Sequence, residues 1–421
     1  MKKGTVMDKL FENTVNSISE IIRFNSEKCA PEKGMPFGKG AADCLDYFLK
    51  LARSFGFQTV NYDNYAGEVI FGEGEDFAIL AHLDVVPAGS GWVHAPFGGE
   101  IDYENKRIWG RGAMDDKGPA VIVLYCMKQL KDEGFKPNKR IRLIVGCNEE
   151  SGWECIKYFN AHSTMPEIGF SPDADFPVIY AEKGIMHLKF TFHVKGDYSS
   201  LKGGNAPNMV CDECAVKAPA AVEKLKELNL SVENGLIVAH GKSAHGSTPE
   251  QGINAIAPIL EYLGLDEIHE KLFVTKFGLT KLKDETGALT FSPDVVRGGK
   301  GFVTVVCDIR YPATKSRDEV LSALAGENYE ILSEQAPLFN DKQCELIQVL
   351  CGAYNSVTGN NVKPIAIGGG TYARALKCGA AFGPEEEGEE NVIHQPNEYI
   401  TFEKIEKCLK IYKLAIERLT K

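Results

Sequence analysis

The sequence has no surplus of basic residues: 47 Lys and Arg face 58 Asp and Glu in 421 residues, a formal net charge of −11. Proteins that bind nucleic acid need basic surfaces that neutralise phosphates, so this balance argues against a nucleic-acid partner. Long apolar runs are absent too. The longest, Ala120 to Met127, is far shorter than the ~18 residues that cross a bilayer. We therefore expect neither nucleic acid nor a membrane as a partner.

Cysteine-based zinc motifs are missing too, and we expect no secretion signal. Cys211 and Cys214 have CxxC spacing, but no second CxxC and no HxxxH completes a zinc site. The N-terminal segment lacks the apolar stretch and the small-residue cleavage site of a signal peptide. Twelve cysteines without such a signal predict reduced thiols and a cytoplasmic location.

The composition is that of an ordinary globular protein, with 44% hydrophobic and 25% charged residues. In the first 182 residues, short apolar runs alternate with amphipathic helical segments. We expect helices at 10–22, 41–55, 117–133 and 152–160, and strands at 76–83, 140–147 and 168–171. This alternation predicts an α/β domain with a mainly parallel sheet and helices on both faces.

The pattern changes near Lys183. Residues 186–194 alternate strictly between apolar and polar, and residues 302–311 place Val303, Val305, Cys307 and Ile309 on one face. Both patterns are typical of antiparallel strands with one solvated face. We expect a helix at 251–263 between them. The change predicts an α+β domain at 183–336, inserted into a first domain formed by 1–182 and 337–421. Further helices near 341–358 and 402–419 complete that first domain.

Five clusters of metal-binding side chains follow predicted strands or occupy adjoining loops. They are His82 with Asp84, Asp115 with Asp116, Glu149 with Glu150, Asp173 with Asp175, and His394. His82 and Asp84 face the same way in an extended chain, so one could bind a metal while the other orients it. They could equally be a buried histidine satisfied by an aspartate.

The next two clusters also leave two interpretations open. Asp115 and Asp116 could cap the helix that follows, or one of them could bridge two cations. Glu149 and Glu150 could divide the work of metal ligand and general base, or could form a solvated turn. Taken together, the five clusters offer one ligand too many for a single tetrahedral zinc that keeps an open position. They suit two cations that share one carboxylate and a water, as in two-metal hydrolases.

The sequence resembles the M20 family of di-metal peptidases, and most closely its PepV-type bacterial dipeptidases. The resemblance rests on nine stretches in family order between about residues 80 and 400: HLDVVPAGSGW, GRGAMDDKGPA, GCNEESGW, SPDADFPV, GGNAPNMV, GKSAHGSTPE, DIRYP, GGGTYAR and IHQPNEYI. The fold it implies is a di-metal catalytic domain with an inserted α+β lid domain, in agreement with the two predicted domains.

The resemblance implies a ligand set of two imidazoles and three carboxylates: His82, Asp115, Glu150, Asp173 and His394. In that set, Asp115 bridges the two metals, His82 and Asp173 complete one site, and Glu150 and His394 complete the other. It also implies that Glu149 is the general base acting on the bridging water and that Asp84 orients His82. Asp116, which follows a cis peptide in the family, is then structural.

In the lid, the resemblance implies that His245 stabilises the oxyanion of the tetrahedral intermediate. Asn208 and Arg310 would hold the substrate, since a guanidinium pairs well with a free C-terminal carboxylate. The backbone of Gly369, Gly370 and Thr371 would approach the substrate closely. Without the resemblance, His245 would be interpreted as a capping or surface histidine.

The leading hypothesis is a dipeptidase, with a small peptide as its substrate and two divalent metal ions as cofactors. Zinc is the first expectation, and manganese or cobalt are alternatives. A second hypothesis is an M20 amidohydrolase acting on N-acyl amino acids. A non-catalytic peptide-binding protein is disfavoured by the intact Glu149 and metal set, and a nucleotide-binding protein by the missing P-loop lysine. The long lid favours a monomer.

Overall fold

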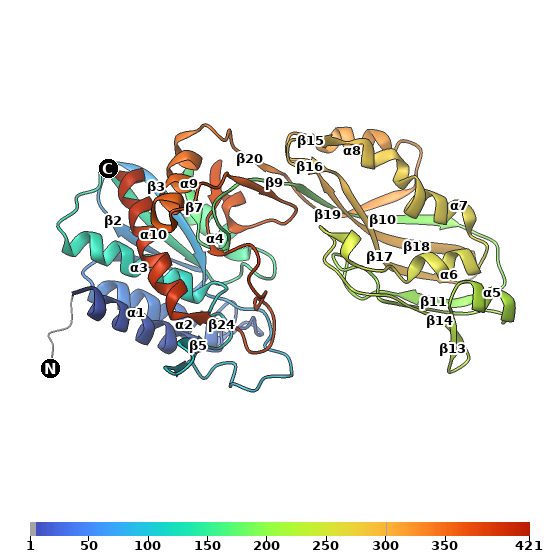
Figure 1. The fold of residues 1–421 in the computed structure, drawn as a ribbon, viewed down its shortest axis with the longest axis horizontal. Helices are drawn as coiled ribbons and strands as arrows, with labels where there is room; N and C mark the ends of the chain where they lie inside the picture. The colour runs from blue at the N-terminus through green and yellow to red at the C-terminus, as the bar shows by residue number, and fades with distance from the viewer. Residues whose placement is uncertain (1–5, 300) are drawn as a thin grey trace. The chain divides into compact units, whose positions relative to one another are not determined.

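The computed structural model describes residues 6–299 and 301–421 (Figure 1). The chain forms two units. The first runs to Tyr180 and takes in Asn340–Ile365 and Thr371–Lys421, and the second comprises Ala181–Phe339 and Ala366–Gly370. No helix within the described residues has both the length and the apolar character needed to cross a membrane.

A mixed sheet organises the first unit, and its last strands carry the chain into and out of the second unit. Its strands in spatial order are β1 (Gln58–Tyr62), β2 (Ala66–Phe71), β6 (Lys139–Gly146), β3 (Glu75–His82), β7 (Ile168–Ser171), β22 (Cys378–Ala381), β9 (Ile179–Glu182) and β20 (Leu338–Phe339), with β21 (Ile365–Ile367) also beside β9. The central strands β6, β3, β7 and β22 are parallel, whereas β1, β2, β9 and β20 pair antiparallel. The predicted α/β class is confirmed, with parallel pairing confined to the centre of the sheet.

Helices cover both faces of this sheet. They are α1 (Val6–Ile22), α2 (Lys39–Ser54), α3 (Lys117–Asp132), α4 (Glu154–His162), α9 (Glu345–Thr358) and α10 (Phe402–Thr420). A side chain at Gly67 of β2 would collide with α2. The next residue, Glu68, points to the opposite face and accepts a hydrogen bond from Tyr62, whose ring packs edge-on against Phe159 of α4. Because neighbouring residues of a strand face opposite ways, α2 and α4 lie on opposite faces.

A small sheet brings two distant loops together in the first unit. Strands β4 (Glu100–Asp102), β5 (Arg107–Trp109) and β24 (Tyr399–Thr401) pair antiparallel. Just beyond this pairing, the Gly110 N–H donates to the Glu398 carbonyl at 2.8 Å. The loop that leads into α3 is thereby fixed beside the loop that leads into β24.

An antiparallel sheet forms the second unit. Its strands in spatial order are β13 (Ser231–Glu233), β14 (Leu236–His240), β12 (Glu213–Lys217), β11 (Ser199–Gly203), β17 (Thr290–Gly299), β18 (Phe302–Tyr311), β10 (Gly184–His193) and β19 (Tyr329–Gln335). The helices α5 (Val222–Glu227), α6 (Ile256–Tyr262), α7 (Asp266–His269) and α8 (Arg317–Ala323) contribute residues to its core. The strands formed by these two segments, β10 and β18, are neighbours, and Met186, Leu188 and Phe190 of β10 face that core together with Val303, Val305, Cys307 and Ile309 of β18.

The helix expected at 251–263 is shorter than predicted, since α6 begins only at Ile256. Ile253 instead pairs with Lys242 in an isolated antiparallel bridge, and 63% of its surface is exposed. The side-chain oxygen of Asn254 then accepts the backbone N–H of Ile256 at 2.9 Å. The apolar spacing of Ile253 matched a helical face, but its backbone hydrogen bonds are made to another segment.

Candidate metal centre

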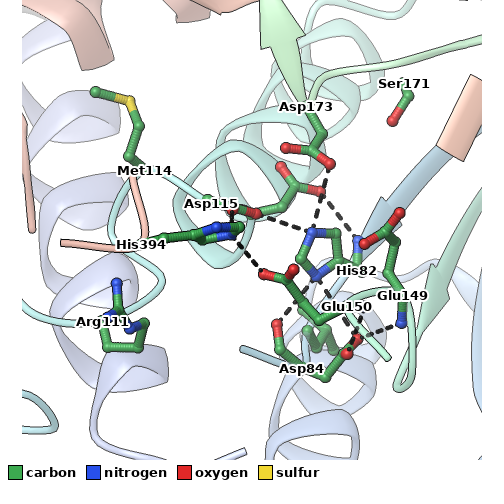
Figure 2. Close-up of polar contacts among 12 residues, drawn as sticks. His82, Asp84, Arg111, Met114, Asp115, Glu149, Glu150, Ser171, Asp173 and His394 are labelled. Atoms are coloured by element: carbon green, nitrogen blue, oxygen red, sulfur yellow. Dashed lines mark hydrogen bonds and ion pairs between the residues drawn. The ribbon is translucent and has the colours of Figure 1, made fainter. Parts of the chain in front are cut away.

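The chemistry-bearing residues of the first unit gather at one edge of its parallel strands. His82 ends β3, Glu149 and Glu150 follow β6, and Asp173 follows β7. Parallel neighbours place their carboxyl ends at the same edge of a sheet, where open α/β folds form their sites. Two loops add Asp115, just before α3, and His394, before β24. Figure 2 shows these side chains pointing toward one another.

Asp115 lies between the two imidazoles. Its Oδ1 is 2.9 Å from His82 Nε2, and its Oδ2 is 2.9 Å from His394 Nε2. Asp173 approaches His82 Nε2 at 3.4 Å from one side, and Glu150 approaches His394 Nε2 at 3.2 Å from the other (Figure 2). The geometry is therefore two clusters, each of one imidazole and one terminal carboxylate, joined by a shared carboxylate.

The donor atoms fit divalent cations. Ligand atoms of His82, Asp115 and Glu150 lie within 4.8 Å of one another. His82 Nε2 and Asp115 Oδ1 are buried, and neither makes a hydrogen bond of acceptable geometry with any described residue. Buried polar atoms without such partners are costly, and a cation between them would satisfy both. Mixed imidazole and carboxylate donors suit zinc, manganese or cobalt.

The carboxylates of the site repel one another. Burial raises the pKa of Glu149 well above its usual range, and the charges of Asp173 and Glu150 add to this effect. Burial also raises the pKa of Glu150 to about 7, with Asp115 as the next contribution. Burial opposes ionisation of Asp115 as well, but its two imidazole partners hold the pKa of Asp115 below its usual value. Positive charge is what this cluster needs to remain fully ionised.

Asp84 supports the site through two different groups. Its backbone carbonyl lies 3.0 Å from His82 Nδ1, while its carboxylate is 3.6 Å from the same nitrogen. A carbonyl only accepts hydrogen bonds, so Nδ1 carries a proton and the Nε2 lone pair of a neutral His82 faces the carboxylates. The carboxylate of Asp84 accepts the backbone N–H of Glu149 at 2.9 Å and that of Glu150 at 3.1 Å.

Asp116 contacts the backbone of His82. A cis peptide joins it to Asp115, as the resemblance implies. It occupies the N-cap position of α3, but its side chain makes no capping hydrogen bond. Its Oδ2 accepts the backbone N–H of His82 at 3.0 Å. Asp116 therefore fixes the end of β3.

Two residues to which the sequence pattern assigned no role, Trp153 and Glu398, contact residues of the site. Trp153 donates from Nε1 to Glu149 Oε1 at 3.2 Å. Glu398, which is fully buried, accepts from Arg111 Nη1 at 2.7 Å and from the backbone N–H of Met114 at 2.9 Å and Asp115 at 3.2 Å. Trp153 and Glu398 lie in the quoted stretches GCNEESGW and IHQPNEYI, so their proximity to site residues was the available signal.

The second unit gathers three further candidate residues. The carbonyl of Asn208 accepts the Gly246 N–H at 2.7 Å, and the backbone of Met209 pairs with that of His245. A side chain at Gly246 would lie 2.2 Å from an oxygen of Asp308. The loop that carries His245 therefore packs directly on Asp308, the residue that pairs with Arg310.

Arg310 uses three of its N–H groups for contacts within the second unit. Its Nε and Nη2 each donate to Asp308 at 2.7 Å, and its Nη1 donates to the Gly368 carbonyl at 3.1 Å. Arg310 is buried. A guanidinium has five N–H groups, so contacts with the described residues leave two of them for another acceptor.

The glycine run is divided between the units, with Gly369 and Gly370 in the second and Thr371 in the first. Thr371 Oγ1 accepts the Ala373 N–H at 3.2 Å and so caps the short helix that follows. A side chain at Gly369 would meet no atom closer than 3.7 Å. At Gly368, by contrast, it would lie 2.8 Å from the Cβ of Ser247.

The sequence profile of Peptidase family M20/M25/M40 matches residues 78–418. YtjP of Bacillus subtilis (strain 168), which is named as a dipeptidase, is 36% identical over 97% of this chain and 98% of its own. The Beta-Ala-Xaa dipeptidase of Lactobacillus delbrueckii subsp. lactis is 34% identical over 100% of this chain and 97% of its own. Among solved structures, the dipeptidase Dug1p from Saccharomyces cerevisiae is similar in fold, with a TM-score of 0.61, 15% identity, and 98% and 97% of the two chains covered.

Proposed function

Since this chain belongs to peptidase family M20/M25/M40, we propose that it is a metal-dependent dipeptidase that hydrolyses the peptide bond of dipeptides or short peptides. The observation that carries the proposal is the carboxylate of Asp115 shared between His82 and His394, with Glu149 close by. Two relatives that align along almost the whole chain carry the name dipeptidase, which supports this substrate class.

The residues present would hold two divalent cations, with zinc as the first expectation and manganese or cobalt as alternatives. One set of ligands is His82, Asp173 and Asp115, and the other is His394, Glu150 and Asp115. Cations bound there would polarise the scissile carbonyl and lower the pKa of a water. The shared carboxylate fixes the two sets relative to each other.

Glu149 is the proposed general base. It accepts a proton from the attacking water and passes it to the leaving amine. Its backbone is held by Asp84, and its carboxylate by the indole N–H of Trp153. The orientation of the carboxylate is therefore set before substrate binds, which reduces the entropy lost in the reaction.

In the proposed lid, residues 183–336, Arg310 offers its two remaining N–H groups to the C-terminal carboxylate of the substrate. His245 donates to the developing oxyanion, and Asn208 holds the substrate backbone. Gly369, Gly370 and Thr371 are proposed as backbone contacts to substrate. We further propose a monomer and, because all twelve cysteines are free thiols, a cytoplasmic location.

The alternative function is an amidohydrolase that acts on N-acyl amino acids. It would use the same metal ligands and the same base, and would differ in whether the group N-terminal to the scissile bond carries a free amine. Turnover of free dipeptides compared with that of N-acetyl amino acids separates the two. Preference for the acylated substrates would overturn the dipeptidase proposal.

The direct test of the mechanism is Glu149→Ala, with Glu154→Gln on the exposed face of α4 as a control. We expect Glu149→Ala to retain two metal equivalents by elemental analysis and to lose dipeptide turnover about 10²- to 10⁴-fold. The control should match the wild type in both measurements. Retained turnover in Glu149→Ala would contradict the assignment of the base.

A further inference from the structure

We propose that Ser247 is a positioning residue that holds the His245 imidazole by Nδ1, with its proton on Nε2. The inference rests on the proposed function, in which His245 donates to the oxyanion. Neither the sequence motif nor the resemblance gave Ser247 a role. The contacts of Ser247 with His245 in the second unit indicate this positioning role.

Two hydrogen bonds from one residue converge on His245 Nδ1. Ser247 Oγ lies 2.6 Å from this nitrogen, and the backbone N–H of Ser247 donates to it at 3.2 Å. A backbone N–H only donates, so Nδ1 is the acceptor. The proton of a neutral imidazole must then reside on Nε2. Protonation of Nδ1 would direct its N–H against that of Ser247.

The main chain around His245 is already fixed. The His245 carbonyl accepts the N–H of Thr248 at 2.9 Å, and the next N–H, of Gly246, is bonded to the Asn208 carbonyl at 2.7 Å. The backbone of Met209 pairs with that of His245. The remaining freedom is rotation of the ring about its side-chain bonds, and Ser247 restricts this rotation.

Ser247 also lies against the stretch that holds Arg310. Its Cβ is 2.8 Å from the position that a side chain at Gly368 would occupy, and the Gly368 carbonyl accepts from Arg310 Nη1 at 3.1 Å. Partial burial of the ring and the charge of Arg310 lower the pKa of His245, against a smaller opposing effect of Asp308. The surroundings therefore favour the neutral ring that the Ser247 contacts require.

The Nε2–H form is the one the proposed reaction needs. The oxygen of a tetrahedral intermediate gains negative charge and requires a donor already in place. An imidazole held by Nδ1 presents Nε2–H without a change in its own charge. A ring free to rotate would present that donor for only part of the time.

The test is an NMR titration of the full chain with ¹⁵N-labelled histidine, in which His245→Ala identifies one of the nine histidine signals. We expect wild-type His245 to carry its proton on Nε2 and to titrate below its usual pKa of about 6.5. Ser247→Ala removes one donor to Nδ1 and should raise the pKa of His245 by about 0.5. Ser247→Thr retains the hydroxyl and should restore the wild-type value.

The matched control is Ser243→Ala, since Ser243 is exposed on the same loop, and it should leave the titration unchanged. A proton on Nδ1 in the wild type, or an unchanged pKa in Ser247→Ala, would overturn the inference. Chemical-shift maps that match the wild type outside the loop establish that the variants are folded.

Turnover then tests the consequence for catalysis. Ser247→Ala should lower kcat for dipeptides about 2- to 10-fold with little change in KM, and Ser247→Thr should recover it. Unchanged kcat would overturn the positioning role. Full activity in His245→Ala would instead contradict the oxyanion role in the proposed function, while the titration would still decide what Ser247 does.

Discussion

Glu398 connects two loops of the candidate metal centre, and its replacement by Gln gives the sharpest prediction. Its carboxylate binds Arg111 and accepts the backbone N–H of Met114 and Asp115, while its own carbonyl accepts from Gly110. Glu398 and Arg111 are both almost completely buried. Glu398→Gln keeps an amide oxygen for the two N–H groups but removes the charge that Arg111 faces.

The expected loss of stability follows from this burial. Breaking a buried ion pair by removing one partner costs about 3–5 kcal/mol, because the other charge stays unpaired. The free energy of unfolding in denaturant should fall by about this amount. Affinity for divalent metal, measured by competition with a chelator, should weaken about 10- to 100-fold, as for other residues that support metal ligands.

Two further variants separate stability from metal binding. Arg111→Met combined with Glu398→Gln removes both charges and should recover part of the stability, yet metal affinity should remain weak because the loop of Asp115 is no longer held by a carboxylate. Glu406→Gln, on the exposed side of α10, should change neither quantity. Wild-type stability and metal affinity in Glu398→Gln would refute this account of the loop.

Three other predictions concern the second unit. Arg310→Lys should raise KM for free dipeptides about 10- to 100-fold but leave dipeptide amides unaffected in steady-state kinetics; equal effects on both would contradict carboxylate binding. Gly246→Ala places a Cβ 2.2 Å from an Asp308 oxygen and should cost about 1–3 kcal/mol in denaturant unfolding, so unchanged stability would contradict the close packing. Burial raises the pKa of Asp294 to about 8, so the folded state keeps a proton that the unfolded chain, with a pKa of about 3.9, releases. The stabilisation of the folded state by protonated Asp294 is fully present below pH ~4 and is lost as pH rises through about 8. The Tm of Asp294→Asn relative to wild type should therefore increase from pH 5 to pH 8. A difference in Tm that stays constant over this range would contradict the raised pKa of Asp294.

The position of a site residue was easiest to predict from the sequence where that residue lies at the end of a predicted strand. His82, Glu149 and Asp173 each follow a short apolar run, and such runs become neighbouring parallel strands. Their proximity therefore follows from the α/β pattern before any side-chain contact is known. His394 lies in a loop without that periodicity, and its place beside Asp115 was indicated by the family resemblance.

Contacts between chain-distant loops were not predictable in the same way. Glu398 meets Arg111 because the pairing of β5 with β24 brings their loops together, and the sequence does not state that pairing. The pairing of Arg310 with Asp308 was easier to predict from the sequence, because Asp308 lies two residues away on the same face of β18. At Ile253 the sequence pattern gave a wrong prediction. Its apolar spacing predicted a helix, but its backbone pairs with Lys242 and α6 begins only at Ile256.

The chain leaves for the second unit along β9 and returns along β20, and these two strands pair antiparallel, with Glu182 opposite Leu338 and Ala181 opposite Phe339. The long insert thus begins and ends at adjacent points, as the loop of a hairpin would. The entropy of closing such a loop grows by only about 0.6 kcal/mol for each doubling of its length. Insertion at such a point leaves the register of the host strands unchanged. This junction is a place where evolution, or a protein engineer, can lengthen, shorten or exchange the insert while the edge of the host sheet that carries the candidate metal ligands keeps its strand order.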